Sequence, residues 1–285
     1  MVSGPVDAKG GTEPGAGSEF DMPRIQYWTN KHQSAEALRI IDKVPVTAKN
    51  ANTVHLLRGL AFRSGRDPEG AVAEFDQVTN LDDLLAKAGL VAGSYSQVER
   101  YDKAIEILDR AIASNANADL YALRGEYKCA QGRFAEAIPD YKKAALKDSD
   151  RQRAYLCVGG ELLRRQGKVK EALSLLDVGL KAPDRSSDGK YYLCRAMCYG
   201  QINDWPLAEQ SCSIGLKIAD NAIAKAARAR HGSVEEIAKS QLLLERAKCY
   251  DHLGKKNLAA LDREAHLKLS AATEDDLLGA AEKSR

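Results

Sequence analysis

Seven alanines stand at nearly constant spacing along the chain. The first five steps between them run from 33 to 36 residues, and the sixth is 51 residues. A period near 34 residues is typical of a stacked helical repeat, in which each unit packs only on its neighbours. The seven positions are Ala37, Ala71, Ala104, Ala137, Ala172, Ala208 and Ala259.

The residues around each alanine have matching sizes. Four residues after six of the seven comes an apolar or aromatic residue, such as Phe75 or Leu176, with Arg263 as the exception. Twelve residues before six of them comes a glycine or an alanine, such as Gly59 or Gly160. A small residue lets two helices cross closely and a bulky one fills the flanking space, so the pattern predicts a helix crossing at each alanine.

Turn residues separate the two helices of each unit. Five or six residues before five of the alanines stand a glycine or an asparagine, which supply the left-handed backbone conformation that ends a helix. Each unit is therefore expected to be an antiparallel helical hairpin. These residues are Gly65, Gly132, Gly167, Asn203 and Gly254.

Residues 24–268 resemble the tetratricopeptide repeat family, whose unit of about 34 residues carries small and bulky residues at such fixed positions. Residues 122–127 (ALRGEY) with residues 132–138 (GRFAEAI) carry the resemblance most clearly. It implies an all-α fold, a right-handed superhelical solenoid of six to seven antiparallel hairpins. We expect one continuous solenoid over residues 22–272 and a helix over residues 273–285 that covers its last hairpin.

The first 21 residues are rich in Gly, Pro, Ala and Ser without any period, which predicts a disordered tail. Residues 17–20 (GSEF) resemble the remnant of a cloning site, so they carry no functional argument. No stretch of about 18 apolar residues predicts a membrane span, and the amino terminus lacks the apolar core of a secretory signal. We therefore expect a soluble, cytoplasmic protein without membrane insertion.

Six cysteines raise the question of a metal or redox site. Cys194 and Cys198 are one helical turn apart, as are Cys249 and His252. Two ligands without two more at workable spacing are a weak metal site, and cysteine fits wherever a helix crossing needs a small apolar residue. We expect free, core-packed thiols in a reducing compartment, with no metal and no cofactor.

No enzyme motif is present. The five histidines form no zincin pattern, and no phosphate-binding glycine loop occurs. Lys and Arg number 42 against 40 for Asp and Glu, so no excess charge favours nucleic acid or an anionic membrane. We expect a protein that is not an enzyme, with no catalytic residues.

The resemblance also implies where a ligand binds, because family members line a concave groove with fixed positions of each first helix. The acidic tails of heat-shock chaperones need several converging basic and amide side chains, and these positions are mostly Leu, Gly, Ala and Cys here. A peptide with apolar anchors and a basic residue for the glutamates fits better, although the leucines could instead belong to the core. The implied residues are Leu56, Leu60, Gly89, Gly93, Ala122, Glu126, Cys157, Glu161, Arg164, Leu193 and Met197.

The long step between Ala208 and Ala259 predicts an extended hairpin over about residues 219–240. Residues 219–230 are rich in alanine and uninterrupted, and Ser233 with Glu236 matches a capping box. Lys225, Arg228 and Arg230 lie close to its expected tip and form a possible secondary docking site. Solvated helix charge explains them equally well.

Three functions remain open at this point. The first is a non-enzymatic scaffold or adaptor that binds a peptide or protein segment in the groove. The second is a structural or self-assembling solenoid that oligomerises through its groove or end hairpins. The third, an RNA-binding helical repeat, is disfavoured because no aromatic residues stand among the basic ones.

Overall fold

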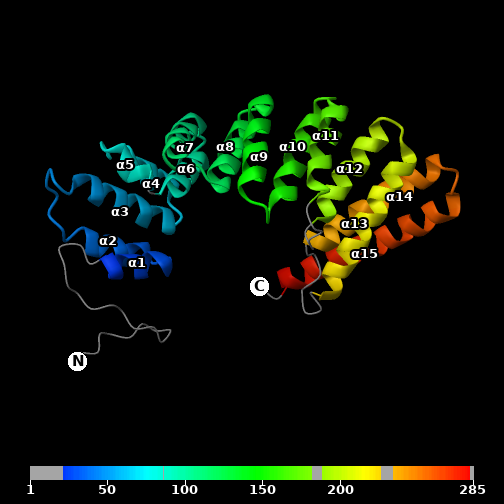
Figure 1. Ribbon diagram of the computed structural model, residues 1–285. Helices are drawn as coiled ribbons and strands as arrows, with labels where there is room; N and C mark the ends of the chain where they lie inside the picture. The colour runs from blue at the N-terminus through cyan, green and yellow to red at the C-terminus, as the bar shows by residue number, and fades with distance from the viewer. Residues whose placement is uncertain (1–21, 86, 182–187, 226–233, 283–285) are drawn as a thin grey trace. The chain divides into compact units, whose positions relative to one another are not determined.

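The computed structural model describes residues 22–85, 87–181, 188–225 and 234–282. Within these residues it contains fifteen α-helices and no strand (Figure 1). The chain divides into two compact units, residues 1–133 and 134–285, which we call the N-terminal and C-terminal units. The single solenoid expected over residues 22–272 stays a prediction.

The helices of the N-terminal unit are α1 to α8. They are α1 (Met22–Asn30), α2 (Ser34–Ile41), α3 (Ala51–Ser64), α4 (Pro68–Phe75), α5 (Leu81–Leu85), α6 (Ala88–Gln97), α7 (Tyr101–Asn115) and α8 (Ala118–Ala130).

The C-terminal unit contains α9 to α15. They are α9 (Phe134–Lys147), α10 (Gln152–Arg165), α11 (Val169–Gly179), α12 (Gly189–Gln201), α13 (Trp205–Lys225), α14 (Val234–His252) and α15 (Lys256–Glu282). We call the helices that carry the repeated alanines second helices (α2, α4, α7, α9, α11, α13 and α15). The helix before each of them in the repeat pattern is a first helix (α1, α3, α6, α8, α10, α12 and α14).

The repeated alanines form the centre of the packing. All seven are 0% exposed, and so are Ile41, Leu108 and Leu176, each four residues after its alanine. The predicted size matching is confirmed in atomic contacts. A methyl group added to Gly59 would lie 2.3 Å from the ring of Phe75, and one added to Gly160 would lie 2.9 Å from Leu176. Glycine thus allows the two helices to cross at these points.

Every first helix ends in a left-handed residue five positions before the next alanine. Gly132, Gly167, Asn203 and Gly254 have positive φ values, as predicted. The prediction for Gly65 is wrong, because its φ is −79° and Arg66, one residue later, has a φ of +63°. His32 and Glu99 occupy the same place in their hairpins with φ values of +55° and +59°. The turn geometry is thus kept in all seven hairpins even where a residue other than glycine adopts it.

Side chains fix several helix starts. Asp67 accepts a hydrogen bond from the backbone N–H of Gly70 at 2.8 Å, and Pro68 occupies the first position of α4. Asn117 accepts one from the N–H of Leu120 at 3.0 Å at the start of α8. These contacts satisfy backbone donors that lack a partner in the first turn of a helix.

An aspartate–arginine ion pair recurs between successive hairpins. In each case the aspartate stands five residues after the alanine of one second helix, and the arginine lies on the next first helix. The arginine side chains are mostly buried while the aspartates are half exposed. The pairs are Asp42 with Arg58 (2.7 Å), Asp109 with Arg124 (2.5 Å) and Asp177 with Arg195 (3.1 Å).

The C-terminal unit contains one deeply buried ion pair. Arg153 of α10 donates to the carboxylate of Asp188 at 2.6 Å, and the two side chains are 5% and 4% exposed. Arg153 Nε also donates to the carbonyl oxygen of Gly179 at 2.8 Å, and its guanidinium lies 5.3 Å from the ring centre of Tyr191. This network joins α10, α11 and the start of α12.

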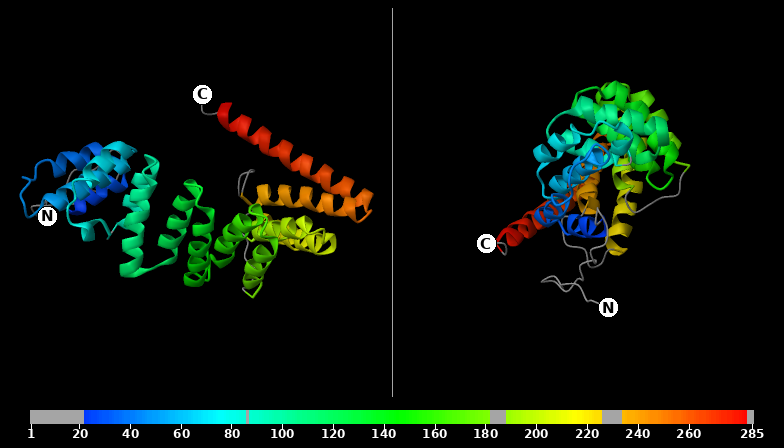
Figure 2. Two further views of the ribbon diagram at one scale, coloured as in Figure 1. Left: turned by 90° about the horizontal axis from the view of Figure 1, so that it is seen from above. Right: turned by 90° about the vertical axis from the view of Figure 1, so that its left-hand side faces the viewer.

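The last two hairpins have long helices. α13 has 21 residues, α14 has 19 and α15 has 27, and α14 and α15 lie side by side (Figure 2). The predicted separate helix over residues 273–285 is wrong, because α15 continues without a break to Glu282. Residues 269–273 (LSAAT) contain no glycine or proline that would end it. Among the described helices, none combines the length and apolarity that a membrane span requires.

Candidate functional site

The predicted leucines of the N-terminal unit lie at the border between core and surface. Leu56 and Leu60, on α3, are half-buried and pack against the core cluster that contains Phe75 and Val91. Their packed sides therefore stabilise the fold, and their role in a binding groove stays a prediction.

Gly89 lines a hollow of about 720 Å³ in this unit. A methyl group added to Gly89 would lie 3.4 Å from Leu123 of α8, which is an ordinary van der Waals contact and not an overlap. Apolar walls with a few polar groups are typical of ligand pockets. The other lining residues come from α5, α6, α7, α8 and the segments next to them, and include Leu85, Ala88, Ala111, Asn115, Asn117 and Leu120.

Gly93 lies next to the guanidinium of Arg63. A methyl group on Gly93 would lie 3.8 Å from Arg63 Nη2 and 3.7 Å from the hydroxyl of Tyr127. Arg63 Nε is shielded from solvent and has no hydrogen-bond partner in the described part of the chain. A buried N–H group without an acceptor costs about 1–3 kcal/mol, so an acceptor from a ligand would stabilise this site.

The electrostatics of this cluster involve Tyr127 and its neighbours. Burial raises the pKa of the Tyr127 hydroxyl, and the negative charge of Glu126 adds to the increase. A hydrogen bond with Ser96 and the positive charge of Arg63 oppose it. Glu126 is exposed and the predicted Ala122 is half-buried on the same helix. Arg63, Gly93, Ser96, Glu126 and Tyr127 thus form one polar cluster on α3, α6 and α8, which we call the Arg63 cluster.

The predicted residues of the C-terminal unit are arranged differently. Glu161 accepts two hydrogen bonds from Arg164, both of 2.7 Å, and one from Arg165 of 2.6 Å. Burial alone would raise the pKa of Glu161, but the bonds from Arg164 and Arg165 outweigh it and lower the pKa. The carboxylate of Glu161 is therefore already paired with two guanidinium groups, and a basic residue of a peptide would have to compete with them for it.

The remaining predicted groove residues of this unit lie on α10 and α12. Cys157 is half-buried, and its thiol lies 3.4 Å from the carbonyl oxygen of Lys190. Leu193 packs against the core cluster around Leu242, and Met197 is half-buried. The structure thus uses part of each predicted side chain for packing.

All six cysteines are free thiols. Cys194, Cys198, Cys212 and Cys249 are buried, as predicted for core packing, whereas Cys129 and Cys157 are only half-buried. Burial raises the pKa of Cys198, as does its hydrogen bond with Cys194, which is the larger effect. Both effects keep this thiol protonated and unreactive.

The possible secondary docking site falls mostly outside the described residues. Lys225 is exposed at the end of α13, while Arg228, Arg230 and the capping residue Ser233 lie outside the described ranges. Their role as a docking site stays a prediction.

No metal centre is formed by the described residues, which contain no group of three or more His, Cys, Asp or Glu side chains with suitable geometry. Ser240 and His266 are in contact, with the hydroxyl oxygen 2.8 Å from Nδ1. The same Nδ1 lies 3.1 Å from the carbonyl oxygen of Ser240, so both contacts of this nitrogen are to one residue of α14.

Sequence reasoning missed Arg63 and Ser96. Each stands eight residues before its alanine, the same position that drew attention to Arg164. Applying that position to every hairpin would have found both residues. The shielding of its Nε atom had no signal in the sequence, because it depends on how the helices pack around Arg63.

No protein-family model matches this chain. A search of curated proteins gives no match either. Among solved structures, the chain is similar to the C-terminal part of a TPR repeat-containing protein from Cytophaga hutchinsonii, with a TM-score of 0.64 and 17% identity over 90% of this chain and 97% of that one. The chain has the tetratricopeptide repeat fold.

A second similar structure with this fold is the protein MamA. It matches with a TM-score of 0.50 and 17% identity, covering 65% of this chain and 99% of that one. At such identities the tetratricopeptide repeat likeness concerns the path of the backbone, so the ligand has to be inferred from the side chains of this chain.

Proposed function

We propose that this protein is a non-enzymatic interaction scaffold whose N-terminal unit binds an extended protein segment along α3, α6 and α8. The observation that carries the proposal is the buried Nε–H of Arg63, which has no acceptor within the described residues. A carbonyl or carboxylate oxygen of a bound segment would supply the missing acceptor once the Arg63 side chain turns its Nε–H, which is shielded in the structure, toward the ligand.

The glycines make room for the ligand at this place. Gly89 and Gly93 lie one helical turn apart on α6, and neither has a side chain to keep a bound backbone at a distance. A side chain at position 93 would lie within contact distance of Arg63 and Tyr127. A segment that crosses α6 would therefore bring its own carbonyl groups to the Arg63 cluster.

Apolar and acidic groups beside the Arg63 cluster indicate which other features the ligand should have. The hollow beside Gly89 fits an apolar side chain, and the outer sides of Leu56 and Leu60 add apolar surface. Exposed Glu126 favours a basic residue in the ligand. The proposed ligand thus has an apolar anchor, a backbone carbonyl at Arg63 and a positive charge near Glu126.

The fold supports a binding role in general terms. In stacked helical hairpins, the side chains at one position of successive repeats lie on a single continuous surface. Repeat proteins bind partners on such surfaces. The sequence contains no recognised enzyme motif. A protein-interaction scaffold is the function that these observations favour.

The experiment compares a variant that carries a bulky side chain on a first helix with a variant that carries one on a second helix. Gly93→Leu places a bulky side chain over Arg63 and Tyr127 while improving helix propensity. Ala113→Leu adds the same bulk at an exposed position of the second helix α7. In pull-downs from the source lysate, a partner should bind the wild type and Ala113→Leu but not Gly93→Leu. Partners that bind all three equally would contradict the proposal.

A further inference from the structure

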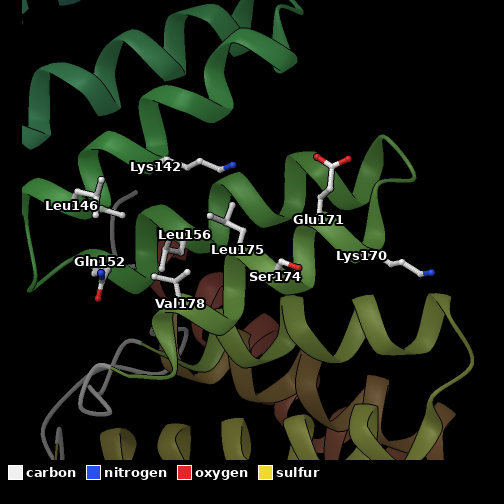
Figure 3. A pocket seen from close by; sticks show the side chains of 10 residues that line it. Lys142, Leu146, Gln152, Leu156, Lys170, Glu171, Ser174, Leu175 and Val178 are labelled. Atoms are coloured by element: carbon white, nitrogen blue, oxygen red, sulfur yellow. The ribbon is translucent and has the colours of Figure 1, made fainter.

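A second hollow lies on the second helices of the C-terminal unit. It has a volume of about 520 Å³ and lies between α9, α10 and α11 (Figure 3). Leu146, Leu156, Leu175 and Val178 provide much of its apolar lining, Lys142 extends over it from α9, and Lys170 lies at the end away from Leu146. None of the predicted groove residues lines it. We call it the α9–α11 hollow.

The apolar surface of this hollow departs from the pattern of the other hairpins. Leu146, nine residues after its alanine, is 80% exposed, where four other hairpins have Asn80, Lys181, Lys217 and Lys268. Val178, six residues after its alanine, is 45% exposed, where the four preceding hairpins have Lys43, Gln77, Arg110 and Lys143. The repeat thus places apolar side chains in solvent at two positions that elsewhere are mostly polar.

Space for a ligand arises from one small residue. Ala145, eight residues after its alanine, is buried in the wall of the hollow. At this position Ile112, Leu180 and Leu216 stand in three other hairpins. The smaller side chain of Ala145 thus occupies less of the space beside α11 than a leucine or isoleucine would.

The charge beside the hollow is opposite to the charge at the same repeat positions of the neighbouring hairpins. Lys142 occupies the position at which the neighbouring hairpins have the aspartate of the recurring ion pair, and Gly159 replaces the partner arginine on the next first helix. A side chain at Gly159 would meet Leu175 at 3.1 Å. In the described residues neither Lys142 nor Lys170 has an ion-pair partner, so two ammonium groups stand free beside an exposed apolar surface.

We propose that the α9–α11 hollow is a second docking site, which binds a segment of another protein carrying two neighbouring apolar side chains next to a carboxylate. The apolar side chains contact Leu146, Leu156, Leu175 and Val178, and the carboxylate pairs with Lys142 or Lys170. The departures in size, polarity and charge all occur in one hairpin step. Glu171, at the same end as Lys170, leaves a net charge of one positive unit from the two lysines and this glutamate.

The test uses the full chain and a phage library of random 16-residue peptides. Peptides selected on the wild type should carry paired apolar residues beside Asp or Glu. Leu146→Glu should weaken their binding by about tenfold or more, since it removes an apolar contact and adds a repelling charge. The double variant Lys142→Glu with Lys170→Glu should select peptides with Lys or Arg in place of the acids.

Two controls keep the outcome specific. Leu267→Glu, at a leucine that is 65% exposed on the second helix α15, adds the same charge to the same unit and should leave binding unchanged. Gly93→Leu should also leave it unchanged, because it blocks the Arg63 cluster of the N-terminal unit. Circular dichroism verifies that every variant keeps its helices.

Three results would overturn the proposal. The first is that no peptide is enriched, or that the selected peptides bind Leu146→Glu as well as Leu267→Glu. The second is loss of binding in Gly93→Leu, which would assign the peptides to the first helices. The third is a concentration-dependent increase of mass in sedimentation that disappears in Leu146→Glu, which would show that a second copy of the chain occupies the hollow.

Discussion

Left-handed residues at the ends of the first helices show how single positions are constrained in this fold. Glycine or asparagine adopts this conformation in four hairpins, but His32, Arg66 and Glu99 adopt it in the other three. For residues with a Cβ atom the conformation costs about 1–2 kcal/mol. The sequence alone suggested Gly65 for this place because glycine is the usual residue, and it could not show that the chain turns one residue later.

We expect Glu99→Gly to stabilise the N-terminal unit by up to about 1 kcal/mol, because glycine adopts the left-handed conformation without the Cβ penalty. Urea denaturation measures the change. Ala113→Gly, inside α7, should instead destabilise by about 1 kcal/mol, since there the backbone is helical. Equal destabilisation by both variants would contradict the assigned turn.

The contact between Gly59 and Phe75 gives a second prediction for a single residue. Gly59→Ala should destabilise by about 1–3 kcal/mol, because the new methyl group would overlap the ring and force it to move. Gly93→Ala is the matched control on the next first helix, where the nearest atom would be 3.7 Å away. This control should be neutral or slightly stabilising, and thermal unfolding of both variants decides the point.

The contacts between elements were only partly predictable. Alanine spacing and size matching correctly located the helix pairs, because close packing restricts which residues fit at a crossing. The aspartate–arginine pairs follow an equally regular spacing, yet a charge that recurs at a constant position is just as typical of a solvated helix face. The pairing of Glu161 with Arg164 and Arg165 depends on side-chain conformations that the repeat pattern does not determine.

One ion-pair cluster connects α4 with α6 and the start of α7. Asp76 accepts hydrogen bonds from the Tyr95 hydroxyl at 2.8 Å and from Arg100 at 2.6 Å. Burial alone would raise the pKa of Asp76, but the bonds from Arg100 and Tyr95 lower it below its ordinary 3.8. A lowered pKa in the folded state means that the cluster stabilises the fold at neutral pH and that this stabilisation is lost as the pH falls below about 4.

Asp76→Asn should therefore lower the free energy of unfolding at pH 7 and change it less at pH 3. The two titration curves of stability should converge on the acid side, where the carboxylate of the wild type is protonated. Chemical denaturation across this pH range measures the effect. A difference that stays constant from pH 7 to pH 3 would show that the ionised carboxylate contributes nothing.

The buried pair of Arg153 and Asp188 is expected to be the most sensitive contact between helices. Asp188→Ala leaves the guanidinium buried without its partner, which typically costs about 3–5 kcal/mol. Asp177→Ala is the matched control, because it removes an aspartate whose side chain is half exposed. That loss should be below about 1 kcal/mol. Similar losses in the two variants would contradict the assigned burial.

At the scale of the whole molecule, the chain has two kinds of candidate binding surface. The N-terminal unit offers the Arg63 cluster and the hollow beside Gly89 on its first helices. The C-terminal unit offers the α9–α11 hollow on its second helices. The period of the sequence predicts the fold, because every repeat has to satisfy the same packing. The binding surfaces were harder to predict, since they arise where one repeat departs from the others.

The central claim is that a protein segment lies against Arg63 on the first helices of the N-terminal unit. The most direct test places a photo-crosslinking amino acid at position 90 of the full chain, where Leu90 is 41% exposed beside the hollow at Gly89, and irradiates it in the source lysate. We predict a crosslinked partner whose yield falls sharply when Arg63→Gln is added, and no such adduct from the same probe at position 113. An adduct at position 90 that is unaffected by Arg63→Gln, or no adduct at all, would contradict the account.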